Sequence, residues 1–160
     1  GGIEEFGATY EAQMQAGDMY AKIGRFDEAI KFYEAGVKLN PNDLQANLVL
    51  ANSYFDSKQF ESAEKYYAKV LEINPKDVNA RTDLATTLVE RQNPDYERAI
   101  REFQESLAID PKHEPTLYNL AVAYSRKGDA ENAQKTLIQL EEANPNSQLV
   151  GRLKQIMSAK

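Results

Sequence analysis

The chain has 160 residues, of which 42% are hydrophobic and 28% are charged, and its formal net charge is −6. This length and balance are typical of a single folded domain or a short array of repeats. The negative charge argues against nucleic acid and anionic membranes as partners. The chain has no cysteine and one histidine, His113, which excludes disulfides and metal sites built from several histidines.

Neither a membrane span nor a secretory signal is apparent in the sequence, because no apolar run approaches the required length of roughly 18 residues. We therefore expect a soluble protein that does not insert into a membrane. A cytoplasmic location is favoured, with a periplasmic or membrane-tethered domain as the alternative. Residues 1 to 7, which begin with two glycines, are expected to be a leader or an expression scar.

A proline recurs along the chain at almost constant spacing, with successive gaps of 34, 36 and 34 residues. Each proline follows an alanine by twelve residues and a bulky side chain by eight. The four sets are Ala29, Tyr33 and Pro41; Ala63, Tyr67 and Pro75; Ala99, Phe103 and Pro111; and Ala133, Leu137 and Pro145. Such a period indicates stacked copies of one small unit of structure.

Each repeat is predicted to contain two amphipathic helices, because apolar residues fall at helical spacing on both sides of a break, such as residues 56–58. A second column of small residues lies in the first helices: Gly17, Ala51, Ala85 and Ala121. Short side chains allow paired helices to approach closely, and the bulky residue of the other helix fills the space beside them. The proline ends each second helix.

This pattern resembles the tetratricopeptide repeat from about residue 8 to 145, although the usual tryptophan is replaced by Gln13, Asn47, Arg81 and Leu117. The resemblance implies an all-α fold, a right-handed superhelical array of antiparallel helix pairs without strands. We expect the four repeats at about residues 8–41, 42–75, 76–111 and 112–145.

Two segments depart from the regular pattern. The third repeat has two extra residues within 90–95, which predict a longer loop or an extra half-turn, with Pro94 in the first turn of the next helix. Residues 146–160 are expected to form a C-terminal capping helix that covers the last repeat. Its apolar stripe consists of Leu149, Val150, Leu153, Ile156 and Met157.

Motifs for catalysis are missing. The glycines form no phosphate-binding loop, and the acidic pairs lack the spacing of a calcium loop. His113 lies in a link between repeats, where we expect it to be exposed. We therefore predict no enzymatic activity, no cofactor and no metal.

The resemblance also implies that the first helices line a concave groove that binds a peptide or a partner protein. The predicted contact residues are Gln45, Leu48, Asn52, Phe55, Asn79, Thr82, Asp83, Thr86, Tyr118, Asn119 and Val122. A wider set adds Glu11, Met14, Gln15, Asp18, Lys22, Val49, Asp56, Glu90, Ser125 and Arg126. The asparagines suit a peptide backbone, and the apolar members suit side-chain anchors. Leu48, Val49 and Phe55 equally suit packing against a neighbouring repeat.

Part of the family holds the C-terminal carboxylate of heat-shock chaperones with a cationic clamp. Here the corresponding positions are Leu48, Asp83 and Pro115, and the predicted groove contains acidic residues that would repel a carboxylate. The predicted partner is therefore a protein or peptide that is neutral to basic and partly apolar.

Two functions are compatible with this pattern. The favoured one is a non-catalytic adaptor or scaffold that binds partners in the groove. The alternative is a self-assembling scaffold that forms homo-oligomers, or an interaction domain that was cut from a larger protein. Binding through loop 90–96 or through an end surface stays open. A C-terminal stripe that folds back on its own chain would block assembly at that end.

The alanines that recur in the second helices provide a first test. We expect Ala63→Leu to overpack its helix pair and to lower the free energy of unfolding by about 1–3 kcal/mol. Thermal melting measures this effect, and an unchanged melting temperature would contradict the predicted pairing.

Overall fold

The computed structural model describes residues 9 to 159, which form nine α-helices and no strand. The segment that we expect to be a leader, residues 1 to 7, lies outside the described residues. In chain order the helices are α2 (Tyr10–Lys22), α3 (Phe26–Leu39), α4 (Leu44–Asp56), α5 (Phe60–Ile73), α6 (Val78–Glu90), α7 (Tyr96–Ile109), α8 (Glu114–Lys127), α9 (Ala130–Ala143) and α10 (Gln148–Ser158).

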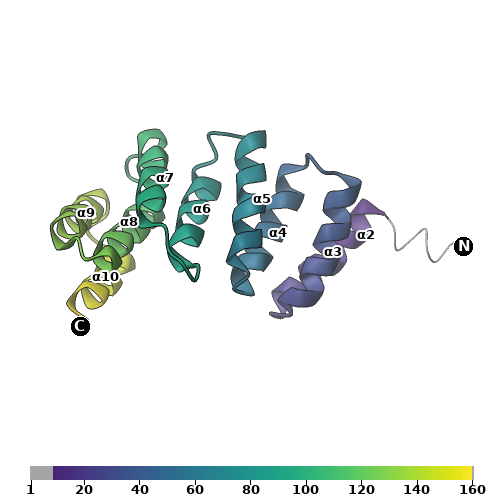
Figure 1. Cartoon of the computed structure of the whole chain (residues 1–160), viewed down its shortest axis with the longest axis horizontal. Coiled ribbons are helices and arrows are strands. Elements are labelled where there is room, and N and C mark those ends of the chain that lie inside the picture. The colour runs from purple at the N-terminus through teal and green to yellow at the C-terminus, as the bar shows by residue number, and fades with distance from the viewer. Residues whose placement is uncertain (1–8, 160) are drawn as a thin grey trace, which may run out of the picture. The chain divides into compact units, whose positions relative to one another are not determined.

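The helices belong to two compact units, with a boundary between Ala80 and Arg81 inside α6. Unit 1 contains α2 to α5 and the first turn of α6. Unit 2 contains the rest of α6 and α7 to α10. In unit 1, α2 packs against α3, α3 against α4, and α4 against α5, as Figure 1 shows. In unit 2, α8 packs against both α7 and α9.

The alanines and the bulky residues predicted in the second helices form the core of every helix pair. The alanines of the second helices are buried, with exposed fractions of 0% at Ala29, Ala63 and Ala99 and 1% at Ala133. The bulky partners Tyr33, Tyr67, Phe103 and Leu137 are 0–3% exposed. In unit 1 the contact is tightest at Gly17, where an added Cβ would lie 2.5 Å from the ring of Tyr33. The small residues of the first helices therefore set how closely the paired helices approach.

The first helices share an N-cap position that recurs at the period of the repeat. Thr9, Asp43 and Asp77 accept hydrogen bonds from the backbone amides three residues later, at 3.2, 2.8 and 3.0 Å. Ser147 caps α10 in the corresponding place. These side chains satisfy backbone donors that a helix leaves without partners at its start, so α2, α4, α6 and α10 each begin at a fixed residue, whereas His113 at the start of α8 makes no such bond.

The turn inside most repeats contains one residue in the left-handed backbone region. Gly24 and Gly128 have φ values of 79° and 92°, and Lys58 occupies the same place with φ 63°. In the third repeat the extra residues form the loop 91–95 instead. The prediction for Pro94 was wrong, because Asp95 is the N-cap of α7 and accepts a hydrogen bond from the amide of Arg98, which leaves Pro94 outside the helix.

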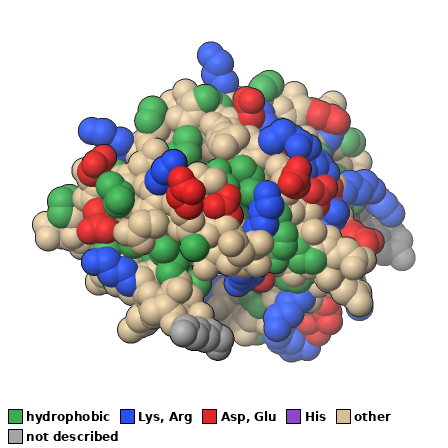
Figure 2. All heavy atoms as spheres, turned by 60° about the vertical axis from the view of Figure 1, so that its left-hand side comes forward, with side chains coloured by type: hydrophobic (Ala, Val, Ile, Leu, Met, Phe, Trp, Pro, Cys, Tyr) green, Lys and Arg blue, Asp and Glu red, His purple; other side chains and the backbone are tan. Residues whose placement is uncertain are grey.

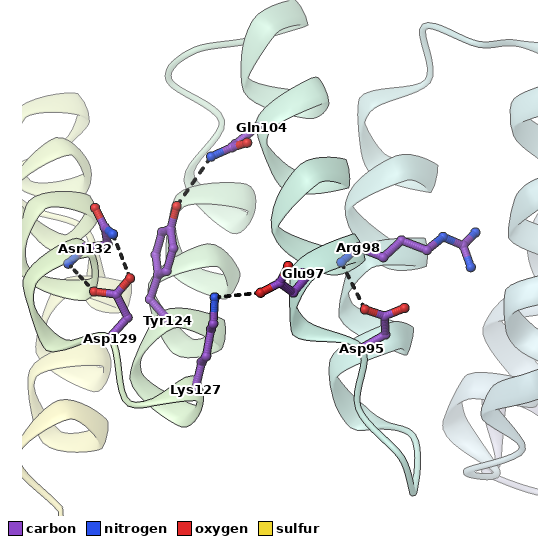
Figure 3. Close-up of polar contacts among 8 residues, drawn as sticks. All are labelled: Asp95, Glu97, Arg98, Gln104, Tyr124, Lys127, Asp129 and Asn132. Atoms are coloured by element: carbon purple, nitrogen blue, oxygen red, sulfur yellow. Dashed lines mark hydrogen bonds and ion pairs between the residues drawn. The ribbon is translucent and has the colours of Figure 1, made fainter.

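In unit 2, polar side chains connect α8 to α7. Lys127 forms an ion pair of 3.3 Å with Glu97, and Gln104 donates to the hydroxyl of Tyr124 at 3.4 Å (Figure 3). Figure 3 also shows Asp129 at the start of α9, where it accepts from the backbone and side-chain nitrogens of Asn132. These exposed contacts add little stability individually, but they align the neighbouring helices.

Helix α10 packs on α8 and α9 of its own chain through the predicted stripe. Leu153 and Val150 are buried at 0% and 8% exposure, and Leu149, Ile156 and Met157 cover the same cluster. The intervening polar residues of α10 are exposed. The apolar face that the last repeat would otherwise present is therefore covered.

The left-handed turn residue provides a stability test. A lysine in this region costs roughly 1–2 kcal/mol relative to glycine, part of which the greater freedom of glycine in the unfolded chain offsets. We expect Lys58→Gly to raise the free energy of unfolding by about 0.5–1 kcal/mol. Urea unfolding measures the change, and Gly128→Ala should shift stability in the opposite direction. A loss of stability in Lys58→Gly would contradict the strain at this turn.

Candidate functional site

In unit 1 the core determines which polar group stands on the face of each first helix. The hydroxyl of Tyr33 donates to Oδ1 of Asp18 at 2.5 Å, and the hydroxyl of Tyr67 donates to Oδ1 of Asn52 at 2.6 Å. Both acceptors directly follow the small residue of the first helix. Two buried rings thus hold two side chains in equivalent places, and this polar position is fixed before any ligand binds.

Asn52 is half-buried, and its carbonyl oxygen is occupied by Tyr67. Its amide nitrogen has no protein partner within the described residues, so two N–H donors are available for a ligand. The predicted role of Asn52 as a contact for a peptide backbone is compatible with this geometry. The same bond also gives Asn52 a structural role that the sequence alone does not predict.

A hollow of about 240 Å³ lies beside Asp18 in unit 1. It is lined by Tyr10, Glu11, Met14, Gln15 and Asp18 of α2 and by Gln45 and Val49 of α4. Except for Tyr10, all of these residues belong to the predicted groove. Burial and a hydrogen bond with Asp43 raise the pKa of Tyr10 above its ordinary value. Burial and the bond to Asp18 do the same to the pKa of Tyr33.

The other predicted residues of unit 1 differ in their surroundings. Leu48 is half-buried, and Asn79 is exposed in the first turn of α6. Phe55 is half-buried and contacts the ring of Phe60 edge-on, with ring centroids 5.3 Å apart. Phe55 is thus partly used by the turn between α4 and α5, and only its outer side could contact a ligand.

In unit 2, Thr82 belongs to a buried network of hydroxyl groups. It is 2% exposed and lies 3.2 Å from Oγ of Ser106 and 2.7 Å from Oγ1 of Thr116. Nδ1 of His113 lies 2.6 Å from the same Thr116 oxygen. The network joins α6, α7 and the start of α8, so Thr82 is a buried link between helices and not the exposed contact residue that the sequence predicted. His113 is half-buried here rather than exposed, because its ring extends this network.

The neighbouring residues of α6 bond within their own helix. Thr86 donates to the carbonyl of Thr82 at 2.9 Å, and the backbone carbonyl of Asp83 accepts from Thr87 at 2.7 Å. Asp83 and Thr86 are both half-buried. Thr86 takes the place in its repeat that Asn52 has in the second repeat, but the bulky partner there is Phe103, which has no hydroxyl.

The three predicted residues of α8 are also partly used by the fold. Tyr118 is half-buried and packs against the core cluster under α10. Asn119 donates to the carbonyl of Pro115 at 2.8 Å, which leaves its side-chain oxygen as an acceptor. Val122 is 7% exposed and belongs to the core. Tyr118 and Asn119 are therefore the better candidates for contact on this helix.

Within the described residues there is no group of three or more histidine, aspartate or glutamate side chains that could hold a metal ion. No described helix is both long and apolar enough to cross a membrane. On the face that Figure 2 shows, acidic and basic side chains are interspersed with small apolar areas. The faces of α2, α4, α6 and α8 that carry the predicted contact residues offer hydrogen bonds and apolar contacts rather than an arrangement of catalytic groups.

A family model described as tetratricopeptide repeat matches residues 20–78, 54–95 and 91–156. The chain belongs to the tetratricopeptide repeat family. Such repeats generally mediate protein interactions and are typically non-catalytic, which agrees with the predicted class of partner. A search of curated protein sequences gave no significant match.

Among solved structures, a crystal structure of MamA protein aligns with a TM-score of 0.78 and 22% identity over 94% of this chain and 83% of that chain. TTC0263, a thermophilic tetratricopeptide repeat protein of Thermus thermophilus, aligns with a TM-score of 0.75 and 19% identity over 94% and 84% of the two chains. At these identities the likeness shows the fold alone, and it confirms the predicted all-α repeat array.

The bond between Tyr67 and Asn52 gives a test of the site geometry. Asn52→Ala removes the acceptor of a buried hydroxyl, and we expect it to cost about 1–2 kcal/mol of unfolding free energy. Asn52→Asp keeps an acceptor in the same place, as Asp18 does for Tyr33, and should remain within about 0.5 kcal/mol of the wild type. Urea unfolding of the two variants compares them, and equal losses would contradict a structural role for this bond.

Proposed function

We propose that this chain is a non-catalytic adaptor or scaffold that binds a peptide or a partner protein through the outward faces of its first helices. These first-helix faces belong to α2 and α4 in unit 1, to α8 in unit 2, and to α6, which begins in unit 1 and continues in unit 2. The observation that supports this most directly is Asn52, whose oxygen is held by Tyr67 while its two N–H donors point to no partner in the described chain. Fixed donors of this kind suit the carbonyls of an extended segment.

The charge of the first helices in unit 1 favours a neutral to basic partner. Along α2 and α4 the only cation is Lys22, whereas Glu11, Asp18 and Asp56 are acidic. A partner with exposed carboxylates would be repelled, and one with lysine or arginine would be attracted. Tyr118 and Leu48 add half-buried apolar surface that can anchor side chains.

Capture experiments test the proposal. Asn52→Asp removes the donors but spares the bond to Tyr67, and Tyr118→Ala removes an apolar anchor. We expect the double variant to lose at least roughly tenfold in affinity for any partner that the wild type captures from a lysate of the source cells. A matched control combines Asn146→Asp, in an exposed turn, with Tyr96→Ala, a similarly half-buried ring on a second helix.

The control pair should retain binding, and both doubly substituted chains should melt within a few degrees of each other. Binding that survives the first pair but is lost in the control pair would place the site on the second helices. Binding that survives both pairs would leave loop 90–96 or an end surface as the contact region.

Self-assembly is the second candidate, and one observation favours it. A largely apolar hollow of about 560 Å³ is lined by Ala16, Met19, Tyr20, Lys22, Ile23 and Phe32. Met19 and Ile23 are 71% and 67% exposed, which is unusual for large apolar side chains. Sedimentation velocity of the wild type and of Met19→Glu with Ile23→Glu tests this. A concentration-dependent oligomer that the substitutions dissolve would favour assembly, and a monomer at all concentrations would reject it.

A further inference from the structure

Asp18 and Asn52 occupy the same place in successive repeats, and each accepts a hydrogen bond from a tyrosine fifteen residues later. Asn52 shows that a neutral amide oxygen can accept the hydroxyl of a tyrosine at this place in the repeat. The fold therefore requires an acceptor at position 18 but does not require a negative charge. The charge of Asp18 is free for another role, and the tyrosine holds it in a fixed orientation at the surface.

The charge of Asp18 lies on the 240 Å³ hollow between α2 and α4, together with that of Glu11. The two residues are seven apart and share one face of α2. Neither carboxylate is paired with a lysine or arginine among the described residues. The cation nearest in the helix, Lys22, lines the other hollow, beside Met19 and Ile23. Two carboxylates that form no ion pair within the described residues thus face one small concave site.

Part of the wall of the hollow is apolar. Met14 lies between the two carboxylates on α2, and Val49 approaches from α4. Tyr10 lines one side with a neutral phenol, and burial and its hydrogen bond to Asp43 raise its pKa further above the ordinary value. The volume is below the roughly 300 Å³ at which pockets for whole small molecules begin, so it suits one side chain of a larger ligand.

We propose that this hollow binds a lysine or arginine side chain of the peptide that the first-helix faces hold. The aliphatic stem would lie against Met14 and Val49, and the cationic end would meet Glu11 and the oxygen of Asp18 that Tyr33 leaves unoccupied. Long basic side chains combine an apolar stem with a charged end in this way. The assignment rests on the proposed peptide-binding function and specifies its ligand.

The probes are four acetylated and amidated pentapeptides, Ala-Leu-Xaa-Leu-Ala, in which the central residue is lysine, arginine, norleucine or acetyl-lysine. Each is titrated into the ¹⁵N-labelled chain, and binding is followed from backbone amide shifts. We expect the lysine and arginine peptides to shift amides of Glu11 to Asp18 and of Gln45 to Val49. They should bind about fivefold or more tightly than the two neutral peptides, with a difference that shrinks in high salt.

Removal of one carboxylate tests the assignment at residue level. Asp18→Asn and Glu11→Gln should each weaken the lysine peptide by about two- to fivefold, the range for exposed charge pairs, and leave the norleucine peptide unchanged. Asp18→Asn should keep the melting temperature of the wild type, because the amide still accepts from Tyr33. Asp27→Asn and Glu61→Gln are matched controls on the second helices of the same unit, and they should change neither affinity.

The outcomes separate the two proposals. Equal binding of the lysine and norleucine peptides on the first-helix faces would overturn the basic-side-chain site and leave the peptide-binding function standing. A lysine preference that survives Asp18→Asn combined with Glu11→Gln would do the same. Shifts confined to the second helices would overturn both proposals. A total absence of shifts at millimolar peptide would overturn the basic-side-chain site, since the capture experiment tests the function independently.

Discussion

The close approach of the two helices in each pair is the constraint on which the rest of the structure depends. It requires a small residue on one helix at the place where a bulky one stands on the other. Gly17 under the ring of Tyr33 is the extreme case, because even one added carbon would lie 2.5 Å from the ring. The position of the ring then decides where its hydroxyl emerges at the surface. The packing of the core therefore sets the chemistry of the first-helix face.

This dependence explains why the two units differ although their helices follow one pattern. In unit 1 the bulky column is tyrosine, and its hydroxyls fix Asp18 and Asn52 as polar surface groups. In unit 2 the bulky residues are Phe103 and Leu137, which have no hydroxyl. The places that correspond to Asp18 and Asn52 are occupied by Thr86 and Val122. One of these bonds to its own helix and the other is buried. At this position the face of unit 1 is consequently the more polar of the two.

Much of the fold could be predicted from the sequence, because the small and bulky columns obey the geometry of a single helix pair and recur in phase. The stripe of the last helix was predictable for the same reason. Thr82 was not, because its burial depends on Ser106 and Thr116, which come from two other helices. Pro94 was misplaced because the two extra residues lengthened the loop and made Asp95 the cap. The tyrosine bonds left a detectable signal, a polar residue fifteen positions before tyrosine in two successive repeats.

Carboxylate footprinting of the chain, with and without its captured partner, tests the central claim most directly. A carbodiimide modifies accessible carboxyl groups, and mass spectrometry measures each site. The account predicts that the partner protects Glu11 and Asp18 on the first-helix face, whereas Asp27 and Glu61 on the second helices react as before. Protection confined to the second helices, with Glu11 and Asp18 unchanged, would contradict it.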